Sequence, residues 1–143
     1  ERSGLYTRRI VEKSAEMGFD AVFAAHSHTT QAGEYLTGKP CFYSLGNVSM
    51  SPGTFYSVSE SLPEYGLAGH LYIDEKKIAK VTVSIFKMVE ENGEALRVVP
   101  VDLLYRSLSD EKKAKLMADL SSVYKRVIGR EHTWAEPQKE YDL

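Results

Sequence analysis

The sequence predicts an α/β fold made of an αβ unit, a β-meander and a C-terminal helix. Three patterns indicate it: a helical pattern followed directly by a short apolar run, alternating apolar and polar residues over 67–101, and a long amphipathic pattern over 110–128. The chain has 143 residues, of which 43% are hydrophobic and 27% charged. That length allows one domain with a core, and we expect no second well-packed domain.

The αβ unit is expected at the start of the chain. Residues 5–17 have helical spacing, and Gly18 suits the end of that helix. The stripe of this helix consists of Tyr6, Ile10, Ser14 and Met17. Residues 19–25 form an apolar run too short for another helix, which predicts a buried strand. The polar residues 26–31 then fall at the C-terminal edge of that strand, where ligand sites of open α/β sheets gather.

A hairpin is expected next. Residues 34–36 and 41–45 predict two short strands, and residues 37–40 supply the turn between them. Residues 49–66 are rich in Ser, Pro and Gly and predict a long surface loop.

The β-meander follows this loop. Its three predicted strands cover residues 67–74, 78–89 and 95–101. Asn92-Gly93 is a strong hairpin dipeptide, and Pro100 places the end of the third strand near a sheet edge.

The chain is expected to end in a helix and a polar tail. The helix covers residues 110–128, with Ser109 as its N-cap and Gly129 at its end. We interpret its apolar face as core, with a partner-binding surface as the alternative. The tail, residues 130–143, is expected to be partly disordered. Its candidate anchors are Trp134 and Tyr141.

Composition excludes several classes of function. The formal charge is −2 and the pI about 6.1, which argues against a nucleic-acid partner. No run approaches the ~18 apolar residues of a membrane-spanning helix. The single Cys41 rules out an intrachain disulfide. Because the chain starts at Glu1 without a signal-like apolar run, we interpret it as a piece of a longer protein.

His26 and His28 are the residues most suited to chemistry. In an extended segment, side chains at i and i+2 project on the same side, with Cα atoms ~6.5 Å apart. Two imidazoles so placed can bind one ion, or one each of two ions ~3.5–4 Å apart. A His-x-His pair alone more often consists of polar loop residues at a sheet edge. We interpret His70 as a half-exposed strand residue and Cys41 as a small buried side chain.

Two segments, residues 18–31 and 39–47, carry a resemblance to a known family. The first combines a helix end, an apolar strand and His26-Ser27-His28-Thr29-Thr30-Gln31, and the second reads KPCFYSLGN. Together they resemble the bacterial capsule-synthesis proteins of the CapA/PgsA type, a branch of the calcineurin-like metallophosphoesterase superfamily. The resemblance is strong over residues 5–47, looser to residue 101 and absent beyond.

The resemblance implies a four-layer α/β sandwich with a dinuclear metal centre. His26 and His28 match metal ligands of that centre, while Gln31 and Asn47 match residues adjacent to it. Ala25 stands where the superfamily usually has Gly, and Ser27 where the family commonly has Pro.

The superfamily's other ligand motifs are not found upstream of His26. We therefore expect residues 1–106 to be the C-terminal half of such a domain, and residues 107–143 an added helix and tail. The partner implied is the N-terminal half of the same protein.

The resemblance implies a role in making or exporting capsule, such as poly-γ-glutamate, in the cell envelope or outside the cell. The parent would be a metal-dependent hydrolase of phosphoester or amide bonds; Mn, Fe and Zn all suit His and carboxylate ligands. We expect the fragment alone to hydrolyse no phosphoester. The alternative is a non-hydrolytic accessory that binds the envelope polymer or other capsule-synthesis proteins. Oligomeric state stays open.

Overall fold

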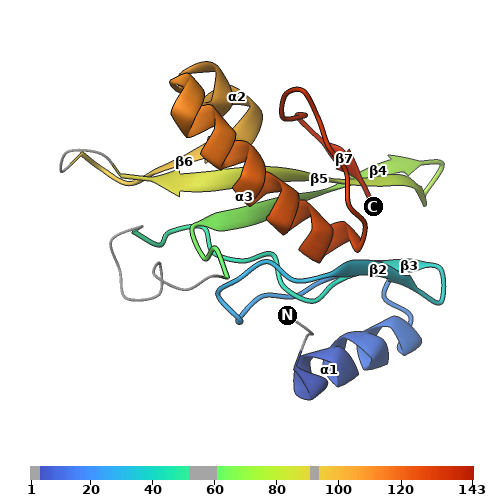
Figure 1. The fold of residues 1–143 in the computed structure, drawn as a ribbon. Coiled ribbons are helices and arrows are strands. Elements are labelled where there is room, and N and C mark those ends of the chain that lie inside the picture. Colours follow the sequence, from blue (N-terminus) through green and yellow to red (C-terminus); the bar gives the residue numbers. More distant parts are fainter. Residues whose placement is uncertain (1–3, 52–60, 91–93) are drawn as a thin grey trace.

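The computed structural model describes residues 4–51, 61–90 and 94–143, which form a mixed α/β fold (Figure 1). One sheet has the strand order β1-β3-β2; the other has β4-β5-β6, with β7 also paired to β5. The elements are α1 (Leu5–Glu16), β1 (Val22–Phe23), β2 (Gly33–Leu36), β3 (Lys39–Phe42), β4 (Tyr65–Asp74), β5 (Lys77–Val89), β6 (Arg97–Pro100), α2 (Val101–Arg106), α3 (Asp110–Ile128) and β7 (Tyr141–Asp142).

Strand β3 separates two apolar cores because its side chains alternate between the two faces of the small sheet. Phe42 is fully buried with residues of β4, β5 and α3, whereas Cys41 and Tyr43 are buried against α1. Helix α1 accordingly lies on the side of the small sheet away from the larger one, and α2 and α3 flank the larger sheet (Figure 1). The sheets are also joined directly, because Leu67 donates its backbone N–H to the Leu45 carbonyl at 2.8 Å.

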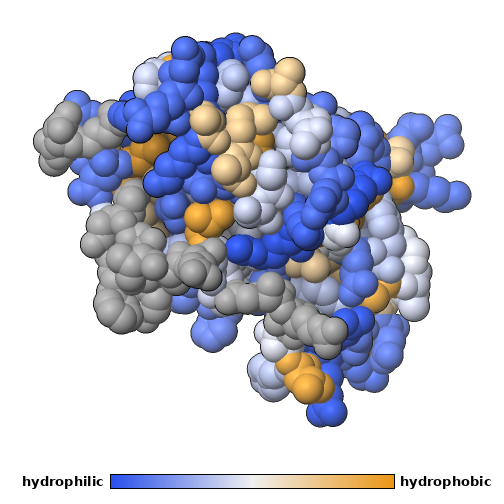
Figure 2. Space-filling view, in the orientation of Figure 1, coloured by the Kyte–Doolittle hydropathy of each residue, from blue (hydrophilic) through white to orange (hydrophobic). Residues whose placement is uncertain are grey.

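Helix α1 forms where it was predicted, but its buried face differs from the predicted stripe. Val11 and Ala15 are the buried residues. The stripe is largely exposed: Tyr6 to 78%, Ile10 to 49% and Met17 to 71%. Figure 2 shows apolar surface over this helix. The helical spacing therefore predicted the helix correctly, but it did not predict which face of the helix packs against the small sheet.

The predicted buried strand over residues 19–25 is shorter and more exposed than expected. Only Val22–Phe23 pairs as β1, and it lies at the edge of the small sheet, parallel to β3. Phe19 is 57% and Phe23 38% exposed. Among the described residues β1 pairs with β3 alone, so it lies at a sheet edge and its side chains are less covered than those of a central strand.

Both hairpins are confirmed where the structure describes them. Thr37 and Gly38, with φ of 50° and 79°, form the two-residue turn between β2 and β3, so Lys39 and Pro40 belong to the strand and not to the predicted turn. Glu75 and Lys76 form a similar turn between β4 and β5. Strand β4 starts at Tyr65, so it includes the last two residues of the predicted loop. Residues 52–60 of that loop, and the turn at 92–93, lie outside the described residues.

The C-terminal part contains one helix that the sequence did not predict. The third meander strand ends at Pro100 instead of residue 101, and Val101 begins the short helix α2. Helix α3 has the predicted bounds, and its apolar face is buried in the core, as interpreted. The Ser109 side chain makes no capping hydrogen bond.

The tail is held against the body of the protein, so the expectation of partial disorder was wrong. Tyr141 pairs with Val83 as part of β7. Trp134 lies edge-on to Tyr124 at 4.6 Å and to Tyr141 at 5.1 Å between ring centroids. These aromatic contacts confirm Trp134 and Tyr141 as the anchors of the tail.

Candidate functional site

The loop that carries the histidines is fixed at both ends by backbone hydrogen bonds. Ala24 donates to the Phe42 carbonyl at 2.9 Å, and Gln31 donates to the Ser44 carbonyl at 2.9 Å. Between these anchors, His26 and His28 have positive φ values of 120° and 59°. The loop is therefore not the extended segment that the i, i+2 argument assumed.

His26 and His28 are nevertheless neighbours. Both are exposed, and their ring centroids lie 6.5 Å apart with a 40° angle between the ring planes. A ring centroid lies ~3.2 Å from an ion that the ring ligates, given a Zn–N distance of ~2.1 Å. Two rings on one tetrahedral ion therefore have centroids ~5 Å apart. The observed separation suits one ligand to each of two adjacent ions better than a shared ion.

Asn47 clamps the histidine loop. Its Nδ2 donates to the carbonyl oxygens of His28, at 2.7 Å, and of Pro63, at 2.9 Å. These two bonds fix the orientation of the amide, so that Oδ1, 2.8 Å from Nδ1 of His28, is an acceptor. In its neutral form His28 then carries its proton on Nδ1, and Nε2 has the lone pair. A histidine that ligates a metal through Nε2 needs this tautomer.

Gln31 lies beside this loop in a buried position. It is 6% exposed, and its Oε1 has no hydrogen-bond partner among the described residues; the same holds for Oγ1 of Thr30, which is fully buried. A buried oxygen without a donor costs ~1–3 kcal/mol. An orphaned oxygen at the end of the histidine loop suits a position that binds or orients a ligand. Gln31 makes no described contact with either histidine.

Pro63 is part of the site, although the sequence offered no signal for it. Its backbone carbonyl accepts the hydrogen bond from Asn47, and Pro63 lies just before β4.

A buried charged cluster lies next to Pro63. Glu64 has a largely buried carboxylate whose Oε2 has no described partner. Lys87 lies 3.9 Å from Glu64 and 3.6 Å from Asp119, and it donates to Tyr65 Oη at 2.9 Å. Burial, together with Asp119, raises the pKa of Tyr65.

The described residues do not complete a metal centre. No group of three or more His, Cys, Asp or Glu side chains suited to one ion is found within 4–51, 61–90 and 94–143. If the two histidines ligate a metal, any further His, Cys, Asp or Glu ligand comes from outside these residues.

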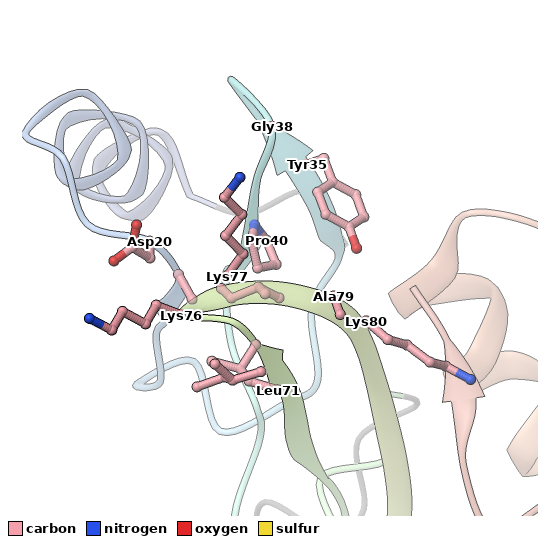
Figure 3. Close-up of a pocket in the computed structure, with 12 residues that line it drawn as sticks. Asp20, Tyr35, Gly38, Pro40, Leu71, Lys76, Lys77, Ala79 and Lys80 are labelled. Carbon is pink, nitrogen blue, oxygen red and sulfur yellow. The ribbon is translucent and has the colours of Figure 1, made fainter.

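A cavity of about 420 Å³ lies elsewhere, between the β2–β3 and β4–β5 turns (Figure 3). Lys76, Lys77 and Lys80 line it together with Asp20. Figure 3 shows the three amino groups pointing in different directions. Lys80 also pairs with Asp142 at 2.8 Å. The cavity therefore offers no convergent set of groups and is separate from the histidines.

The other candidates have structural roles. Cys41 is fully buried, and burial raises the pKa of its thiol, so it is a core residue as interpreted. His70 is half-buried and bonds to Ser84 Oγ at 2.8 Å. Tyr35 of β2 is 50% exposed.

The fold and the site define an α/β chain whose His-x-His loop is clamped by a distant asparagine. Residues 3–51 match the family model of the bacterial capsule synthesis protein PGA_cap. This match confirms the family resemblance over about a third of the chain, a segment that contains His26, His28, Gln31 and Asn47. No curated protein matches the chain. Among the described residues, no helix is both long and apolar enough to cross a bilayer.

Proposed function

We propose that this chain carries part of a dinuclear metal site in a hydrolase that acts in capsule synthesis. The match of residues 3–51 indicates capsule synthesis, and an envelope location goes with that role. The metal site is supported chiefly by one observation, the contact of Asn47 Oδ1 with Nδ1 of His28, because it assigns the tautomer that a metal ligand needs.

Each residue of the site has a proposed task. His26 and His28 each ligate one of two divalent ions, of which Mn, Fe and Zn are chemically suitable. Asn47 holds His28 in place, and Gln31 presents its unpartnered Oε1 to a ligand or substrate. When bound, two such ions lower the pKa of a water and polarise the bond to be cleaved. The proposed role is in making or exporting an envelope polymer such as poly-γ-glutamate, through cleavage of a phosphoester or amide bond that this process requires.

The remaining ligands are proposed to come from the N-terminal half of the same protein. The surface of α1 and β1 supports this partner. Arg8 of α1 lies 3.6 Å from Glu34 of β2, so that side of the helix faces β2. At 100° per residue, Ile10 and Met17 lie on the opposite side, toward the edge strand β1 that precedes the histidines. Exposed apolar side chains and an edge strand are what a covering strand and helix would bury.

The proposal is tested in the protein that contains this chain, expressed in cells that make the polymer. We expect His26→Ala and His28→Ala to lower both the bound metal, measured by elemental analysis, and the cell-bound polymer by tenfold or more. His132→Ala is the matched control, because His132 is exposed and lies against Trp134 in the tail. Normal polymer with reduced metal would contradict the hydrolase and favour the non-hydrolytic accessory. Unchanged metal would contradict the site itself.

A further inference from the structure

A groove with an apolar floor and a basic rim lies between strands β5 and β6 and the helices α2 and α3. It consists of two cavities of about 410 and 200 Å³. The cavities adjoin, because both are lined by Val89, Leu104, Leu108 and Lys112. The histidine site contributes no residue to either cavity.

Ser107 and Ser109 line the groove beside an aliphatic floor, which comes from every surrounding element. Its side chains are Val89 of β5, Val99 of β6, Leu104 of α2, Leu108 of the following turn and Leu116 of α3. Leu116 is buried, whereas the other four are half-buried. The groove therefore exposes parts of core side chains, and a flexible hydrocarbon chain would cover them. Each buried methylene favours such binding by about fourfold.

The rim of the groove is cationic, and of its four cations Lys87 is paired with Glu64 and Asp119. Arg97, Lys112 and Lys115 line it, and none of them makes an ion pair or hydrogen bond with another described residue. None of its described lining residues is acidic. The cavity near Lys76 differs in both respects, since Asp20 lines it and Lys80 is paired with Asp142 (Figure 3). Unpaired cations beside an apolar floor favour an anionic head on a hydrocarbon chain.

We propose that this groove binds one molecule of a long-chain anionic amphiphile. The aliphatic chain lies on the floor formed by Val99, Leu104 and Leu108, and the phosphate or carboxylate head meets Lys112, Lys115 and Arg97. The ligand enters as a monomer and not as part of a bilayer. This inference does not depend on the metal site.

The probe is dodecyl phosphate below its aggregation concentration, titrated calorimetrically into the whole chain. We expect saturable 1:1 binding. Octyl phosphate should bind at least tenfold more weakly because four methylenes are lost. Dodecyltrimethylammonium should also bind at least tenfold more weakly, because its head is cationic. Lys112→Glu/Lys115→Glu should weaken dodecyl phosphate binding by tenfold or more.

The matched control is Lys76→Glu/Lys77→Glu, which changes the net charge equally at the exposed turn between β4 and β5, away from the groove. It should change the affinity by less than twofold. Equal weakening in both double variants would overturn the proposal, as would equal affinity for the octyl and dodecyl chains. Binding to phosphatidylglycerol vesicles without binding of monomeric dodecyl phosphate would also overturn it, in favour of adsorption to a charged surface. Comparing the octyl and dodecyl ligands tests binding to the apolar floor without substituting core residues of the protein.

Discussion

Asn47 forms hydrogen bonds with both the ring and the backbone of His28, although the two residues lie nineteen positions apart in the chain. The amide oxygen lies 2.8 Å from Nδ1, and the amide nitrogen donates to the His28 carbonyl at 2.7 Å. These two bonds tie the loop after β1 to the segment after β3. The orientation of His28 as a proposed metal ligand therefore depends on Asn47, which is not itself a proposed ligand.

Asn47→Ala should loosen His28 as well as destabilise the fold. It removes the hydrogen bonds to the His28 ring and to the carbonyls of His28 and Pro63. We expect a loss of about 1–3 kcal/mol in unfolding free energy, measured by urea denaturation. Nitrogen NMR should report a smaller population of the Nδ1–H tautomer of His28, with His132 as the internal control. An unchanged His28 tautomer would show that Asn47 does not set it.

Gln31→Met should separate function from stability. The substitution keeps a similar side-chain volume and removes the buried oxygen that has no described partner. We expect an unfolding free energy that is unchanged or higher by about 1 kcal/mol, because the desolvated amide is lost. Cell-bound polymer should nevertheless fall at least tenfold if Gln31 contacts a ligand. Destabilisation with normal polymer would assign Gln31 a purely structural role.

Gly46→Ala should destabilise the junction of the two sheets. Gly46 has φ of 79°, and an added Cβ would lie 2.8 Å from the Tyr65 carbonyl oxygen. The strained φ costs ~1 kcal/mol and the clash adds ~1–3 kcal/mol. Gly38→Ala is the matched control, because Gly38 has the same φ and nothing within 4 Å of its Cβ position. Equal losses in both variants, measured by denaturation, would exclude the close contact as a cause.

Glu140 should make the attachment of the tail sensitive to acid. Hydrogen bonds from Thr82 and Tyr72 lower the pKa of Glu140 below its usual value of 4.5. A lowered folded-state pKa stabilises the protein above pH 4.5, and this stabilisation is lost as the pH falls through the folded-state value. Glu140→Gln should therefore have a lower melting temperature than the parent at pH 7, with a difference that shrinks below pH 4. A constant difference would contradict the linkage.

The elements most predictable from sequence were those with a long apolar pattern or with clear turn or cap residues at their ends. The helix over 110–128 was predicted with its exact bounds because its apolar spacing runs to Gly129, which has φ of 78° and ends it. The β4–β5 strands were predicted from their period-2 alternation. Helix α2 was missed, because six residues after Pro100 give too short a pattern to separate from a strand.

The site was predictable only in part. His26 and His28 are close in sequence, so their pairing could be inferred, and Asn47 was assigned to the site's surroundings by resemblance. The Pro63 carbonyl has no side-chain signature, since any residue supplies a backbone oxygen. Tyr6 and Met17, which belong to the predicted apolar stripe of α1, are exposed. Apolar character alone therefore does not show which face of a helix a sheet covers.

By itself, the sequence determined the α/β class, the extent of the longest helix and the histidine pair, because local spacing and turn residues encode these. The tertiary structure alone decided which face of α1 is buried, that β1 is an edge strand, and that Asn47 fixes the tautomer of His28. Those outcomes depend on contacts between segments far apart in the chain, and such contacts leave no periodic trace in the residues that make them.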